Sequence, residues 1–346
     1  MRISPARKDR AFAVIVALVA VTVLTIMAGA FAYAMKIETK LAANTNDDEQ
    51  FYWIGRGGVE RACWWLALEG NQPYSSLLQY WNGGPGDGPE TNGPLAGESL
   101  SGFQIGGGTV SLKMTEMESK ININRVDEQL LRQVLTTQGA DAGVIDEVTA
   151  SILDWIQPGE TARPGGAKSD YYIGQTPSYY CKDAPIDNLD ELQLIKGVTR
   201  DLYTGISSDA SSPYARHQLG FGHAPGQEAI YAFGLRDVFT PFSQGQVNIL
   251  TADDKVLQCL PGLDTSQVQA IETAREDPVN RNVGQLLTAA GLPPQSVGQI
   301  GGYLGIVGNT YEVHATATIG QLSHEYTAVV FRSGPNVTVV SFYRSK

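Results

Sequence analysis

The longest uncharged stretch of the chain places the strongest constraint on its fold. Residues 11–35 read AFAVIVALVAVTVLTIMAGAFAYAM and contain no charged side chain. As a helix rising ~1.5 Å per residue, this run spans roughly 37 Å, more than the ~30 Å hydrocarbon layer of a membrane. Four cations and one anion precede it, and this positive excess predicts a cytoplasmic N-terminus with the remainder exported. We therefore expect a chain that is tethered to a membrane or begins there.

Three interpretations fit this stretch. A secretory signal has a shorter apolar core, although Ala32-Tyr33-Ala34 could be its cleavage site. A plain single-span anchor also fits. In the third, a leader peptidase cuts on the cytoplasmic side after Ala11, and Phe12 begins a retained apolar helix, which resembles the type IV pilin class of signal.

Charge and cysteine content narrow the function classes. The chain has 346 residues and a formal charge of −11, and because the first ten carry +3, the remainder carries −14. This acidity argues against phosphate binding and against attraction to an anionic membrane surface. The length predicts one large or two modest domains. Cys63, Cys181 and Cys259 form no metal-type cluster; one pair could bridge after export, or all three could be buried apolar residues.

Periodicity predicts helices and strands along the exported part. Apolar residues at three- and four-residue steps predict that the first helix continues from Lys36 to about Gly70, with a kink near Gly55–Gly58. Residues 82–97 predict a loop, and alternation predicts a strand within 103–117. Residues 205–245 are rich in glycine and aromatic residues with little periodicity, so irregular structure is expected there. Alternation again predicts three closing antiparallel strands around 311–317, 326–330 and 337–343.

An internal repeat lies in the middle of the chain. Residues 121–157 and 247–277 match at a constant offset of 126, and each copy predicts two short helices joined by a glycine-led turn. Each first helix is expected to begin at a capping residue followed by an acid, Asn124 with Asp127 and Thr251 with Asp254. A weaker echo covers 192–199. Such helix pairs cannot bury their apolar faces alone, so a compact helical domain is expected.

Several of these segments together resemble the K-type minor pseudopilin of the bacterial type II secretion system. The segments are the basic leader and apolar helix, Glu49-Gln50-Phe51-Tyr52, Lys120–Asn124, Ile152–Ile156, Pro164–Ala167, Asp170-Tyr171-Tyr172, Asn188–Thr199, Val247-Asn248-Ile249 and Leu260–Asp264. The resemblance covers nearly the whole chain.

The resemblance implies an α+β pilin fold, in which a long N-terminal helix packs on an antiparallel sheet that carries a large inserted helical domain. The inserted domain would consist of helix-hairpin-helix or SAM-like units. The expected parts are a basic leader (1–11), a transmembrane assembly helix (12–35), a stem helix with the first part of the sheet (36–118), the inserted domain (119–302) and the closing strands (303–346).

The same resemblance implies a function. The chain would nucleate or cap the pseudopilus at its tip, bound to the I- and J-type minor pseudopilins and the major pseudopilin. It would lie in the inner membrane as a single-pass protein with the bulk periplasmic, after processing by the prepilin peptidase. Most pilins carry Glu at the fifth mature residue, where this chain has Val16. A buried carboxylate in hydrocarbon needs a partner, so a tip subunit with nothing ahead of it would not need one.

Two departures from the family pattern affect the expected sites. Ala11 stands where the family usually has Gly before the processing cut. The family's loop after the Asp-Trp element is acidic and associated with calcium, which prefers six to eight oxygen ligands. Here Gln157, Gly159 and Lys168 replace expected acids, which leaves Asp154, Glu160 and Asp170 as the candidate calcium ligands.

The upper stem helix is the expected partner surface. Trp53, Trp64 and Trp65 lie on it outside the membrane, and exposed aromatic residues there would need burial against another subunit. The alternative is that these tryptophans pack only on the chain's own sheet.

Two other function classes are less consistent with the sequence. A membrane-anchored, competence-type DNA receptor could use helix-hairpin-helix units, but each repeat copy carries two positive and six negative side chains and would repel phosphates. The four histidines (217, 223, 314 and 324) have no metal spacing, and no Gly-x-Ser-x-Gly elbow or phosphate loop is present. We therefore expect no catalysis and no nucleic-acid binding.

Overall fold

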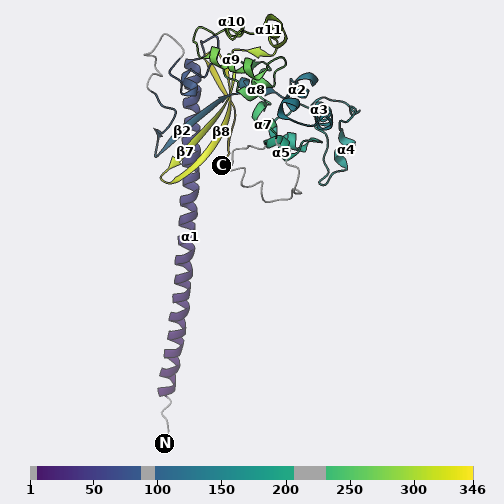
Figure 1. Cartoon of the computed structure of the whole chain (residues 1–346). Helices are drawn as coiled ribbons and strands as arrows, with labels where there is room; N and C mark the ends of the chain where they lie inside the picture. The colour runs from purple at the N-terminus through teal and green to yellow at the C-terminus, as the bar shows by residue number, and fades with distance from the viewer. Residues whose placement is uncertain (1–5, 87–97, 206–230, 346) are drawn as a thin grey trace.

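The chain folds into a long helix whose upper part lies on an antiparallel sheet, with a helical domain beside the sheet (Figure 1). The computed structural model describes the backbone of residues 6–86, 98–205 and 231–345, and their side chains outside 6–11 and 40–47. Most of the loop expected at 82–97, most of the irregular stretch expected at 205–245, and residues His217 and His223 lie outside the described residues. The mixed helix-and-sheet class expected from the sequence is confirmed.

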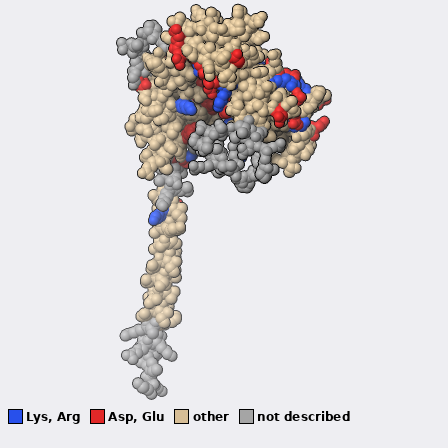
Figure 2. All heavy atoms as spheres, viewed as in Figure 1, with Lys and Arg blue, Asp and Glu red and all other residues tan. Residues whose placement is uncertain are grey.

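The helix α1 runs without interruption from Ala6 to Leu68. Its 63 residues correspond to roughly 94 Å at ~1.5 Å per residue. Phe12–Thr39 is a 28-residue segment long and apolar enough to cross a membrane, and none of it is buried in the chain. Figure 2 shows almost no charged side chains on the part of this shaft whose side chains the structure describes. Here "the head" means the sheet, the part of α1 that packs on it, and the helical domain.

The glycines at 55 and 58 serve close packing and do not interrupt the helix, where the sequence predicted a kink. A Cβ at Gly55 would lie 2.4 Å from the ring of Tyr326, and one at Gly58 would lie 2.8 Å from Val110. Because glycine has no Cβ, the helix axis can approach the sheet at these two positions.

The five-stranded sheet has the order β1-β2-β7-β8-β9, and every neighbouring pair is antiparallel. The three closing strands predicted from alternation are confirmed as β7, β8 and β9. The strands are β1 Phe103–Ile105, β2 Gly108–Glu116, β7 Thr310–Ile319, β8 Leu322–Ser333 and β9 Asn336–Arg344. The core between α1 and the sheet includes Phe51, Ile54, Val59, Trp65, Leu66, Val110, Leu112, Val313, Ala315 and Ala328.

The helical domain is inserted between β2 and β7, which are adjacent in the sheet although far apart in sequence. Two short parallel strand pairs, β3–β4 and β5–β6, lie within it. Its elements are β3 Ile121–Asn122, α2 Glu128–Gln138, α3 Ala142–Ile156, α4 Ser169–Ile173, η3 Leu189–Leu194, α5 Arg200–Thr204, α7 Leu235–Val238, β4 Phe239–Thr240, β5 Val247–Asn248, α8 Asp254–Gln258, α9 Thr265–Arg275, α10 Val283–Ala289, α11 Pro294–Ile300 and β6 Leu304–Gly305. The short helices η1 Tyr80–Asn82 and η2 Met117–Ser119 flank the sheet.

Both copies of the repeat fold alike. Each begins with a short strand and continues as helix, glycine turn and helix: α2–α3 around Gly139, and α8–α9 around Gly262. Both glycines have φ near 90°, a region that favours glycine. The predicted caps are wrong: the side chain that accepts from a first-turn amide is Asp127 in one copy and Asp253 in the other.

Five polar residues, which we call the junction cluster, join the helical domain to the sheet: Ser75, Glu116, Glu118, Asn248 and Arg332. The Asn248 amide donates to both carboxylate oxygens of Glu116 (2.8 and 3.1 Å) and to the backbone oxygen of Ser75 (2.9 Å). Arg332 donates 2.8 Å hydrogen bonds to Ser75 Oγ and to the backbone oxygen of Gly308. Glu118 accepts from three backbone amides, those of residues 244, 309 and 310. The cluster thus ties four separate chain segments together.

Candidate partner surface and loop site

The outer face of the upper stem carries two exposed tryptophans. Trp53 is 67% exposed and Trp64 is 45% exposed, while Trp65 is 1% exposed. The expectation that all three form one partner surface is therefore wrong for Trp65, which packs edge-to-face on Phe103 in the core. Because each helical residue turns ~100°, neighbouring tryptophans point to different sides of the helix.

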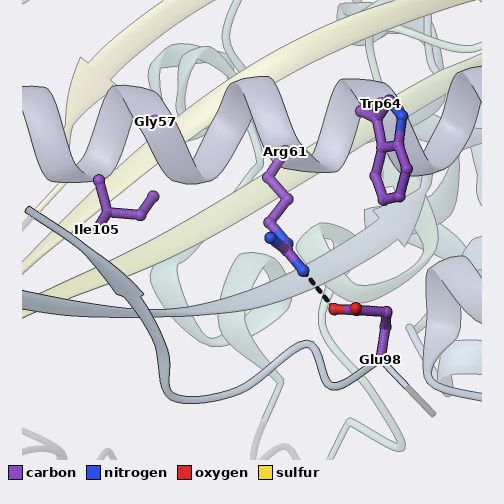
Figure 3. A pocket seen from close by; sticks show the side chains of 5 residues that line it. All are labelled: Gly57, Arg61, Trp64, Glu98 and Ile105. Atoms are coloured by element: carbon purple, nitrogen blue, oxygen red, sulfur yellow. Dashed lines mark hydrogen bonds and ion pairs between the residues drawn. The ribbon is translucent and has the colours of Figure 1, made fainter. Parts of the chain in front are cut away.

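A shallow groove of about 410 Å³ lies beside Trp64, between α1 and the segment that precedes β2 (Figure 3). Its lining residues are Gly57, Arg61, Trp64, Glu98 and Ile105. Figure 3 shows Arg61 reaching from the helix to pair with Glu98. The guanidinium of Arg61 also lies 5.2 Å from the Trp65 ring centre, which holds the groove wall in place.

Trp53, Gly57, Arg61 and Trp64 follow one another at helical spacing and so share one face of α1. This face combines two large apolar rings, a glycine at its centre and a paired cation. Such a composition is typical of a protein–protein contact, because aromatic and Arg residues contribute much of the binding energy at interfaces.

The three candidate calcium ligands are not brought together. Asp154 lies in the last turn of α3 and its side chain is 1% exposed, whereas Glu160 and Asp170 are exposed. No group of three His, Cys, Asp or Glu side chains that could hold a metal is found among the described residues. The residues present do not fit the predicted calcium site.

Two cations of the chain itself surround Asp154 instead. Arg163 Nη1 donates to Asp154 Oδ1 at 2.6 Å, and Lys168 Nζ donates to the backbone oxygen of Asp154 at 2.6 Å. Lys168 also pairs with Asp183 at 2.5 Å. We call Asp154, Arg163, Lys168 and Asp183 the loop cluster. The sequence analysis identifies Lys168 only as a replacement for an expected acid. It does not predict a role for Arg163 or Asp183.

The remaining predicted residues among those described do not form a further site, and one of them, Cys181, contacts the backbone oxygen of Asp154 through its Sγ at 3.5 Å. Ala11 is within α1, and Phe12 is exposed on it. The three cysteines are buried and unpaired. His314 on β7 lies 3.8 Å from Glu312 and 3.2 Å from Glu325, and the pairing with these carboxylates, most strongly with Glu312, raises the pKa of the imidazole. None of the sites formed by residues 6–86, 98–205 and 231–345 points to a reaction, and the absence of catalysis stays a prediction.

Comparisons with a family model and with curated relatives both match protein K of the type II secretion system. Residues 111–208 match the family model described as type II secretion system (T2SS), protein K. The resemblance to protein K is confirmed. Type II secretion system protein K of Klebsiella pneumoniae is 21% identical over 213 residues, covering 57% of this chain and 60% of the relative. The protein K of Pectobacterium carotovorum is 22% identical over 116 residues, 29% of this chain and 35% of the relative. The matched part thus spans less than two thirds of either protein K relative.

A solved structure has the same overall fold. A chain in the crystal structure of the GspK-GspI-GspJ complex of the type 2 secretion system from enterotoxigenic Escherichia coli aligns with a TM-score of 0.61. The alignment covers 88% of this chain and 99% of that chain at 15% identity. At this identity the similarity shows the fold, and it agrees with the pilin-like arrangement of α1 on the sheet.

Proposed function

We propose that this chain is a K-type minor pseudopilin that nucleates or caps the type II secretion pseudopilus at its tip. The observation that carries the proposal is the form of α1, one unbroken helix that joins a membrane-length apolar segment to the head. A rod of this kind can insert among the equivalent helices of a filament. The helical domain widens the head on one side of the sheet (Figure 1) and would prevent another subunit from adding above it.

We further propose the parts that this role requires. The N-terminus lies in the cytoplasm, the prepilin peptidase cuts between Ala11 and Phe12, and the head lies in the periplasm. The positive leader and the apolar segment beginning at Phe12 support this topology. The helix–glycine–helix pairs would be helix-hairpin-helix or SAM-like units used for packing, because their surfaces are acidic.

The proposed partners are the I- and J-type minor pseudopilins, beside the major pseudopilin. The face of α1 that carries Trp53, Gly57 and Trp64 would receive the stem helix of one of them, since it continues the membrane segment upward on the same rod. The complex named for the structural relative supports this choice of partners.

Alanine at both exposed tryptophans tests this proposal. Loss of two interface aromatic anchors is expected to cost about 2 kcal/mol or more each, at least a tenfold loss of affinity. The measurement is co-purification of the I- and J-type proteins with the tagged full chain from detergent-solubilised membranes. Tyr180→Ala is the matched control, because Tyr180 is an equally exposed aromatic residue on the helical domain. Unchanged recovery of both partners by the Trp53→Ala/Trp64→Ala variant would exclude this face as the contact.

A further inference from the structure

The loop after α3 is closed around a lysine. The Lys168 side chain is only 7% exposed, and its Nζ donates to the backbone oxygens of Asp154 and Gln157 at 2.6 Å and to Asp183 Oδ1 at 2.5 Å. An ammonium group has three N–H donors, and three oxygens accept them, two from the C-terminal end of α3 and one from Asp183. The loop therefore already contains a positive centre held by converging oxygens.

Each oxygen of the Asp154 carboxylate beside it also accepts a hydrogen bond from the chain. Arg163 donates from its guanidinium to Asp154 Oδ1 (2.6 Å) and from its backbone amide to Oδ2 (2.9 Å). A Cβ at Gly166 would lie 2.1 Å from Oδ2, so the backbone of the loop is packed directly against this oxygen. A metal at either oxygen of Asp154 would lie beside a donor that is already bound there and, at Oδ2, against the backbone of Gly166 as well.

The charges of the loop cluster balance. Two cations (Arg163 and Lys168) face two carboxylates (Asp154 and Asp183). Buried ions are tolerated when they are paired and hydrogen-bonded, which this arrangement satisfies. A divalent cation would need six to eight oxygens and would lie next to an ammonium group, whose repulsion is strong away from bulk water.

The backbone of Asp183 points to the same conclusion. Its φ of 49° is the one positive φ of a non-glycine residue among the described parts of the chain. Aspartate tolerates this region better than most residues, but the conformation persists only where its surroundings hold it. The ion pair with Lys168 supplies that hold.

We propose that Lys168, with Arg163 beside it, is the resident cation of this loop, and that residues 157–183 close without a divalent metal. The ammonium group of Lys168 holds the oxygens of Asp154, Gln157 and Asp183 together, which is the role that a bound metal ion would otherwise have. The inference concerns the loop alone and stands independently of the secretion role.

The first test is metal content and metal response of the full chain in detergent. After dialysis against calcium and then against metal-free buffer, elemental analysis should find well under one calcium per chain. The thermal midpoint should be the same within about 1 °C in calcium and in EDTA, because a ligand that does not bind the folded state adds no stability. One calcium per chain, or a midpoint about 5 °C higher in calcium than in EDTA, would overturn the proposal.

The second test removes the ammonium with little change of side-chain volume. Lys168→Met leaves two carbonyls and a carboxylate without their donor, so amide hydrogen exchange within 157–183 should become about 100-fold faster. Lys255→Met, at an exposed lysine on α8, should leave exchange in that loop unchanged. If Lys168→Met does not fold, Asp183→Asn removes one charge but keeps an acceptor, and should accelerate exchange there about tenfold. Unaltered exchange in the folded variant would refute the role of Lys168.

Discussion

The junction cluster and the loop cluster both bury a carboxylate against a glycine. At the junction a Cβ on Gly308 would lie 1.7 Å from Glu116 Oε1, and in the loop a Cβ on Gly166 would lie 2.1 Å from Asp154 Oδ2. In each case the missing side chain makes room for a buried carboxylate, which links distant segments at the junction and closes a local loop at Asp154. At both sites a glycine allows the backbone to pack directly against a buried carboxylate oxygen.

They differ in how the charge is neutralised. The loop cluster matches two carboxylates with two cations, whereas the junction cluster sets Glu116 and Glu118 against Arg332 alone. Burial raises the pKa of Glu116 to about 8, and burial likewise raises the pKa of Glu118. Charge is therefore balanced by side-chain cations in the loop and partly by a bound proton at the junction. This difference predicts that the free energy of unfolding contributed by the junction changes with pH.

Replacing the cation of the junction should give the largest effect. Arg332→Met removes two hydrogen bonds, the contact of the guanidinium with the Tyr311 ring and the one cation among the five residues of the junction cluster, so the head should lose about 3–5 kcal/mol of unfolding free energy. The measurement is denaturant unfolding of the detergent-solubilised full chain, followed by tryptophan fluorescence. Arg132→Met, at an exposed ion pair on α2, should cost less than about 1 kcal/mol. Equal losses in the two variants would show that the junction is not the stronger link.

Adding a methyl group at the junction glycine should have the next largest effect. Gly308→Ala forces the buried Glu116 carboxyl away from Asn248, with an expected loss of about 2–4 kcal/mol. Gly302→Ala is the control, since nothing lies within 4 Å of the Cβ it would add. The same denaturant titration measures both, and a loss below about 0.5 kcal/mol at Gly308 would mean that the cluster can rearrange freely.

The sequence predicts the elements that depend on local pattern. Hydropathy alone identifies the membrane-length part of α1, and alternation identifies β7, β8 and β9. The repeat predicts two helix pairs with turns at Gly139 and Gly262, and both occur. These features follow from periodicity and from glycine conformation, which a single chain segment contains.

What the sequence does not predict depends on where segments meet. Trp64 and Trp65 are adjacent residues of the same type, so the sequence does not distinguish them. Trp65 is buried because its side of the helix faces the sheet. The sequence predicts Asp154 as a calcium ligand, whereas its observed partners are Arg163 and Lys168. These two cations reach it only because the loop folds back on the end of α3. The junction cluster joins residues more than 250 positions apart, and no local pattern marks Arg332 as a partner of Ser75.

A titration distinguishes the two clusters most directly. Since burial raises the pKa of Glu116 from 4.5 to about 8, the folded state keeps a proton there that the unfolded state has released. The contribution of Glu116 to stability is therefore complete below about pH 4.5 and falls as the pH rises toward about 8. Glu116→Gln keeps the shape of the protonated acid, so it should remove about 2 kcal/mol of the loss that occurs between pH 6 and pH 7.5.

The control for this titration lies in the loop. Glu160→Gln, at an exposed acid near the loop cluster, should leave the slope of the wild-type chain unchanged. His314 also has a raised pKa and contributes a slope of the same sign, but it is present in both variants and cancels in the comparison. If Glu116→Gln and the wild-type chain lose stability in parallel between pH 6 and pH 7.5, Glu116 is ionised in the folded state. The junction would then resemble the loop, with its charge balanced by Arg332 and by hydrogen bonds from Asn248.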